Sequence, residues 1–81
     1  MRVRVRLFAS LRETAGTGEV RLELPSGATP EDAWARLVAD HPALAPRRAS
    51  LTAAVNRRYA DFQAVLADGD ELVFIPPVSG G

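Results

Sequence analysis

The sequence predicts an α+β domain in which one mixed sheet of four to five strands packs against one main helix. Two short segments near the start alternate polar and apolar residues, which is typical of half-buried strands. An amphipathic segment with strong helix-start signals follows, and shorter apolar segments lead to a final strand. A hairpin followed by a crossover helix favours one sheet that grasps one helix.

The first half of this order follows from residue parity. Residues 2–7 alternate arginine with Val3, Val5 and Leu7, which we expect to point inward, and Phe8 continues the outward parity. Residues 9–15 indicate a short helical turn that ends at Gly16. Residues 19–24 alternate again and form the second expected strand.

The main helix is expected from Thr29 to about Asp40. Thr29 is a suitable cap, Pro30 suits the first helical position, and Pro42 prevents continuation. Its apolar stripe consists of Ala33, Trp34, Leu37 and Val38.

The second half is expected to contain a loop or short turn over residues 43–50 and a buried strand over residues 51–55. Asn56-Arg57-Arg58 is interpreted as a turn, after which Tyr59 begins a short edge strand. Asp68-Gly69-Asp70 predicts a tight turn into the last strand, residues 71–75.

Composition excludes several classes of function. With 81 residues the chain is expected to be one domain. Ten basic and ten acidic residues balance, so we expect no nucleic-acid partner. The absence of cysteine excludes thiol catalysis and thiolate metal sites. No apolar run is long enough for a membrane span, and we expect no membrane partner and a cytoplasmic protein.

The C-terminal residues 76–81 are expected to form an extended tail on a domain of residues 1–75. Pro76 and Pro77 cannot extend a sheet and stiffen the chain, whereas Gly80 and Gly81 carry no side chain. Such a tip can enter a narrow channel in another protein, and a terminal glycine carboxylate is an unhindered acyl group. The alternative is ordinary terminal disorder.

The sequence closely resembles the molybdopterin synthase small subunit family, whose members have the ubiquitin-like β-grasp fold. The residues that carry this resemblance extend over nearly the whole chain. They are Leu7-Phe8-Ala9, Leu11-Arg12-Glu13, Gly16, Ala28-Thr29, Ala54-Val55-Asn56, Asp68-Gly69-Asp70-Glu71 and Ile75-Pro76-Pro77-Val78-Ser79-Gly80-Gly81.

The resemblance implies a cycle of sulfur transfer. An E1-like adenylyltransferase would use ATP to adenylate Gly81, and a persulfide donor would convert it to a thiocarboxylate. Residues 76–80 would thread into partner active sites, and the large subunit would transfer the sulfur to cyclic pyranopterin monophosphate. The family assembles as a heterotetramer, and two loaded carriers serve each dithiolene. The small subunit would supply no catalytic side chain and bind no cofactor or metal.

A docking patch is expected on the open face of the sheet, formed by Phe8, Tyr59 and Ile75. Parity places Phe8 and Ile75 on that face, and the family is hydrophobic at the positions that match these three residues. The alternative is that one or two of them complete a thin core. Arg12 matches a family arginine and could meet an acidic partner group, or remain a solvated helix charge.

Other constellations are interpreted as structural. His41, the single histidine, ends the helix, and no second histidine or cysteine supports a zinc site. Asp68 and Asp70 supply too few oxygens for a calcium loop. Arg47-Arg48 and Arg57-Arg58 are interpreted as solvated pairs. Two other functions remain open: a protein modifier, or carrier for another thiolation pathway such as thiamine or tRNA, acting through Gly81, and a plain interaction module with an idle tail.

Overall fold

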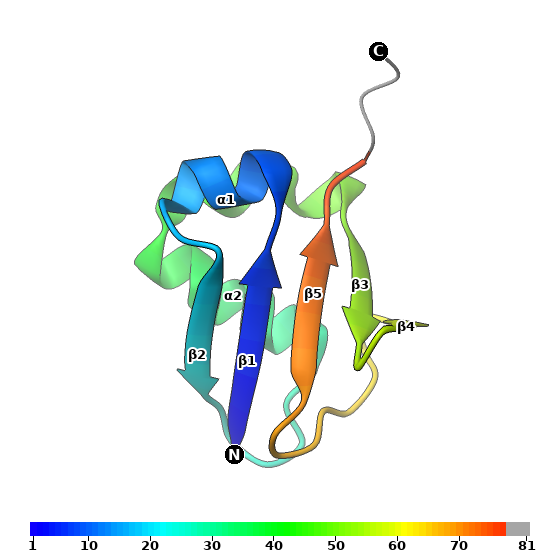
Figure 1. Ribbon diagram of the computed structural model, residues 1–81. Coiled ribbons are helices and arrows are strands. Elements are labelled where there is room, and N and C mark those ends of the chain that lie inside the picture. Colours follow the sequence, from blue (N-terminus) through cyan, green and yellow to red (C-terminus); the bar gives the residue numbers. More distant parts are fainter. Residues whose placement is uncertain (78–81) are drawn as a thin grey trace.

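The computed structural model describes residues 1–77, and within them five strands form one mixed sheet (Figure 1). The sheet order is β2-β1-β5-β3-β4. β1 pairs in parallel with β5, and the other neighbours are antiparallel. This arrangement confirms the expected mixed sheet. The strands are β1 (Arg2–Leu7), β2 (Glu19–Glu23), β3 (Thr52–Val55), β4 (Arg58–Ala60) and β5 (Glu71–Ile75).

The main helix, α2 (Pro30–Asp40), lies across one face of the sheet, and the shorter α1 (Ala9–Ala15) joins β1 to β2 (Figure 1). Thr29 and Asp32 form a reciprocal capping box at the start of α2. Thr29 Oγ1 accepts a hydrogen bond from the Asp32 N–H at 3.2 Å, and Asp32 Oδ2 accepts one from the Thr29 N–H at 3.0 Å. This box satisfies N–H groups that a helix start otherwise leaves unpaired.

The segment after α2 is more ordered than the expected loop or short turn over residues 43–50. It forms a 3₁₀ helix, η1 (Pro42–Ser50), in which Leu44 is fully buried. The Leu44 N–H donates to the His41 carbonyl at 3.0 Å, a short-range bond that suits a proline-containing segment. Burial of Leu44 therefore holds η1 in place, although the hydrophobic periodicity of its sequence does not predict a helix there.

The core lies between the sheet and α2, so only one face of the sheet is covered. Phe74 of β5 is fully buried, and its ring centroid lies 5.0 Å from that of Trp34 in an edge-to-face arrangement. Phe62, in the loop before β5, stacks on Phe74 with 5.9 Å between the ring centroids. The inward positions of β1, which are Val3, Val5 and Leu7, are all buried as predicted. Aromatic pairs of this kind add to the stabilisation from buried apolar area.

One turn differs in detail from the expected one, whereas the predicted turn at Asp68-Gly69-Asp70 is present. The β3–β4 turn contains Asn56 and Arg57, both with positive φ, whereas Arg58 already belongs to β4 and pairs with Val55. In the turn before β5, Asp70 accepts hydrogen bonds from the Ala67 N–H at 2.7 Å and from Asn56 Nδ2 at 2.8 Å. The acidic turn thus connects the start of β5 to the β3–β4 hairpin through hydrogen bonds.

Candidate functional site: the open sheet face and the base of the tail

The base of the tail is attached to the central strand of the sheet. β5 lies between β1 and β3, and alternate residues Leu72 and Phe74 are buried while Val73 and Ile75 lie on the opposite face. The chain leaves the sheet at Pro76, which is half-buried, and Pro77 is exposed. A tail that starts here begins from a strand that is held by hydrogen bonds on both sides. The predicted roles of Val78, Ser79, Gly80 and Gly81 lie outside the described residues.

Phe8 and Ile75 lie together where β1 and β5 end. The parallel register pairs Leu7 with Phe74, so the residues that follow them, Phe8 just after β1 and Ile75 in β5, are neighbours on the open face. Phe8 is 43% exposed although it is a large apolar side chain. The structure therefore brings together two of the three residues of the docking patch.

Tyr59 lies on the same face but at the edge of the sheet. It pairs with Ala54, which in turn pairs with Val73 of β5, so the three residues form one row across three strands. Tyr59 is 82% exposed. The docking patch thus extends from the base of the tail to the edge strand β4, and its role in binding stays a prediction.

A groove lies beside the base of the tail. It has a volume of about 680 Å³, and its walls include Phe8, Ile75, Pro76, Pro77 and Arg47. Arg47 Nη1 lies 3.4 Å from Ser10 Oγ at the start of α1. A groove with apolar walls and one exposed guanidinium at its rim can receive an apolar side chain next to a carboxylate.

Arg12 is placed differently from the docking patch. It lies on α1, is exposed, and covers the backbone of Gly18: a side chain added at Gly18 would have its Cβ 3.2 Å from Arg12 Nε. Arg12 does not line the groove, where the arginine is Arg47. Sequence reasoning missed Arg47 at this position, because nothing in the local pattern of η1 shows that it faces the tail.

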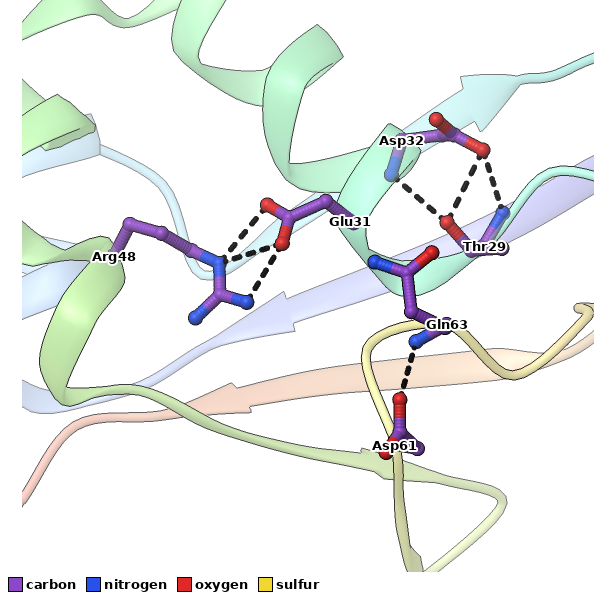
Figure 2. Close-up of polar contacts among 6 residues, drawn as sticks. All are labelled: Thr29, Glu31, Asp32, Arg48, Asp61 and Gln63. Carbon is purple, nitrogen blue, oxygen red and sulfur yellow. Dashed lines mark hydrogen bonds and ion pairs between the residues drawn. The ribbon is translucent and has the colours of Figure 1, made fainter.

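The interpretation of Arg47-Arg48 as a solvated pair is wrong for Arg48. Its guanidinium donates from Nε to Glu31 Oε2 at 2.9 Å and from Nη2 to Oε1 at 2.6 Å (Figure 2). The same group lies over the Phe62 ring, 3.5 Å from its centroid. The Arg48 hydrogen bonds hold the pKa of the Glu31 carboxyl below its ordinary value. Arg48 therefore fastens η1 to α2 and to the loop before β5.

The described residues contain no cluster of three or more histidine, cysteine or acidic side chains that could hold a metal ion. His41 follows α2 as its C-terminal cap residue, and its N–H donates to the Leu37 carbonyl at 2.8 Å. In residues 1–77 no helix is long and apolar enough to cross a bilayer.

The sequence matches the model of a known family. A model described as the ThiS family matches residues 5–81, which is nearly the whole chain. The chain belongs to the ThiS family. The matched residues include the three residues of the docking patch and residues 76–81.

Relatives of this ThiS-family chain are sulfur carriers and small modifiers. The molybdopterin synthase sulfur carrier subunit of Chlamydomonas reinhardtii is 43% identical, with both chains covered over 100% of their length. The crystal structure of SAMP1 from Haloferax volcanii has a TM-score of 0.92 and 37% identity, again with both chains fully covered. The expected ubiquitin-like β-grasp fold is thus confirmed, and the chain is homologous to molybdopterin synthase sulfur carrier subunits.

A more distant structural neighbour comes from the protein complex of subunits 1 and 2 of the molybdopterin-converting factor from Helicobacter pylori. Its TM-score is 0.71 at 23% identity, with both chains covered over 100% of their length. This likeness shows the fold alone.

Proposed function

We propose that this chain carries sulfur as a thiocarboxylate on Gly81 and donates it within a molybdopterin synthase. The carbonyl carbon of Gly81 is the reactive centre, and no side chain of this chain takes part in the chemistry. The observation that supports the proposal most strongly is family membership that extends through Gly81, combined with a tail that leaves the central strand at Pro76.

Activation is needed because a carboxylate at neutral pH resists nucleophiles. An E1-like adenylyltransferase would direct the Gly81 carboxylate onto the α-phosphorus of ATP, with pyrophosphate as the leaving group. The terminal sulfur of a persulfide donor would then attack the carbonyl carbon and expel AMP. A thiol would reduce the resulting acyl disulfide, which releases the thiocarboxylate and leaves the donor as a disulfide. ATP thus belongs to the activating enzyme and is not a cofactor of this chain.

Delivery would take place in a complex with the molybdopterin synthase large subunit. The docking patch would be covered by that subunit, and residues 76–80 would thread toward its active site, where cyclic pyranopterin monophosphate receives the sulfur. The patch suits this role because Phe8 and Tyr59 are exposed apolar side chains on the same face as the base of the tail. Two small subunits would assemble with a large-subunit dimer.

A protein modifier is the second candidate, and the similarity to SAMP1, a small archaeal modifier protein, favours it. In that case an amine of another protein would attack activated Gly81 and form an isopeptide bond. Carriers for other thiolation pathways would use the same thiocarboxylate with a different acceptor.

Intact mass spectrometry tests the proposal. The chain is incubated with ATP and the adenylyltransferase of its own organism, first alone and then with a persulfide donor. We expect a mass increase of one adenylyl group, followed by the replacement of one oxygen by sulfur. Deletion of Gly81 is the matched control and should abolish both changes. Conjugates to larger proteins without any thiocarboxylate would favour the modifier, and an unchanged mass would contradict both candidates.

A further inference from the structure

The half of the open sheet face that is formed by β1 and β2 carries four exposed arginines, Arg2, Arg4, Arg6 and Arg21, which we call the arginine ladder. In the antiparallel register Arg4 lies directly opposite Arg21. Like charges at opposite positions of an antiparallel pair repel each other and destabilise the sheet. The sequence thus keeps two arginines at directly opposite positions of paired strands in the folded protein.

Acidic neighbours neutralise the ladder only in part. Glu71 of β5 is shared by Arg4, at 3.5 Å, and Arg6, at 3.9 Å. Glu19 lies 3.9 Å from Arg4, and Glu23 lies 3.7 Å from Arg2. All four contacts are long, and those of Glu19 and Glu23 are between exposed side chains, a kind of contact that contributes little to stability. Within residues 1–77 the fourth arginine of the ladder, Arg21, makes no ion pair.

The ladder also borders a surface hollow. The hollow has a volume of about 280 Å³ and is lined by Arg2, Arg4 and Arg21 together with Val3 and Gly69. No acidic side chain is among these five residues. An anionic group bound over this hollow would have three arginines beside it, and each guanidinium group can donate more than one hydrogen bond.

The ladder is continuous with the docking patch. Arg6 lies over the Phe8 ring, with its guanidinium carbon 5.4 Å from the centroid, and Arg6 pairs in register with Val73 of β5. Both surfaces belong to one side of a single sheet, in which β1 lies between β5 and β2 (Figure 1), so one protein could cover both.

We propose that the arginine ladder is a second contact surface, which binds an acidic segment of the same large subunit that covers the docking patch. The proposal rests on the proposed function for the choice of partner. The segment carries at least two carboxylates, one of which enters between Arg4 and Arg21. This contact relieves in the complex the repulsion that the free chain contains.

The test uses Arg21→Glu, because this substitution should change folding and binding in opposite directions. In the free chain the new carboxylate faces Arg4, so we expect Tm to rise by about 1–5 °C. In the complex it faces the acidic segment, so we expect about tenfold weaker binding to the large subunit of the same organism at low salt. The difference in Kd should shrink at about 0.5 M NaCl, where exposed charges are screened.

Arg36→Glu is the matched control, because Arg36 is exposed on α2, across the sheet from the ladder, and the substitution changes net charge equally. Its Kd for the large subunit should stay within about twofold of the wild-type value. If Arg21→Glu and Arg36→Glu bind equally well, the ladder is not a contact surface, while the proposed function stands. If the wild-type chain itself does not bind the large subunit, the proposed delivery fails and the contact fails with it.

Discussion

At the scale of single residues, Arg48 joins three parts of the chain that are distant in sequence. Its two-pronged contact with Glu31 and its position over Phe62 connect η1, α2 and the loop before β5. Phe62 stacks on Phe74, the residue that precedes Ile75 at the end of the last strand. Arg48, which is not part of the docking patch, is therefore linked through Phe62 to the core side of the last strand.

Glu31→Gln should reveal this support as a pH-dependent loss of stability. The folded-state pKa of Glu31 is lowered, so its contribution is present above the unfolded-state pKa of about 4.3 and is lost as pH falls through the folded-state pKa. We expect a loss of about 1 kcal/mol in the free energy of unfolding near pH 7, measured with urea. The difference in the free energy of unfolding between Glu31→Gln and the wild type should become smaller below about pH 4.

Glu13→Gln is the control for this experiment, because Glu13 is exposed on α1 and makes no ion pair within residues 1–77. Its effect at pH 7 should stay below about 0.5 kcal/mol. A loss for Glu31→Gln that stays constant down to pH 2 would show that the Arg48 contact does not contribute through the charge of Glu31.

At the scale of elements, the β3–β4 hairpin contains a strained residue. Arg57 has a φ of 69°, and a residue with a Cβ pays an energetic cost in this left-handed region, which glycine avoids. Asn56, with a φ of 50°, tolerates the region better because its short polar side chain bonds locally. Asn-Gly is the residue pair that such two-residue hairpin turns favour.

Arg57→Gly should therefore stabilise the protein. We expect a gain of up to about 1 kcal/mol in the free energy of unfolding, since relief of strain outweighs the added freedom of the unfolded chain. Arg58→Gly is the matched control: Arg58 lies in β4, where glycine weakens a strand, so stability should fall. Thermal unfolding of both variants measures the two shifts. Destabilisation by both would show that the turn is not strained at Arg57.

The elements were predictable from sequence to the extent that their signals are local. Alternation fixed the inward set Val3, Val5 and Leu7, and Thr29 with Pro30 marked the start of α2, as the structure confirms. The order of η1 was not predictable because it depends on burial of Leu44 beneath distant residues. The pairing of Arg48 with Glu31 depends in the same way on how η1 packs on α2.

The candidate site shows the same limit. Parity indicated that Phe8 and Ile75 face away from the core, which the parallel register of β1 and β5 explains. Arg4 and Arg21 lie opposite each other only because of the register in which β1 pairs with β2. These strands are connected through α1, not through a short turn whose sequence would predict the register. Likewise Arg47 reaches the groove only because η1 ends beside the tail.

At the scale of the whole molecule, one face of the sheet is covered by α2, whereas the other carries the exposed side chains of Phe8 and Tyr59. Phe8→Asp tests the docking patch on that open face. Because Phe8 is 43% exposed, the substitution should leave the fold intact while it places a charge in the contact. We expect at least about tenfold weaker binding to the large subunit, measured by calorimetry.

Val65→Asp is the control for Phe8→Asp. Val65 is 72% exposed and apolar, but it lies in the loop between β4 and β5. The affinity of the Val65→Asp variant for the large subunit should equal that of the wild-type chain. Equal losses for the two variants, or unchanged affinity for Phe8→Asp, would place the contact elsewhere.

The parallel pairing of β1 with β5 also has a mechanical consequence. Figure 1 shows the N-terminus and the end of β5 at opposite ends of two adjacent strands. Tension between these two points would shear the strands along their length, so that the hydrogen bonds between them share the load and do not open one after another. Tension between the N-terminus and residue 77 would therefore act along the direction in which the pairing of β1 with β5 resists separation most strongly.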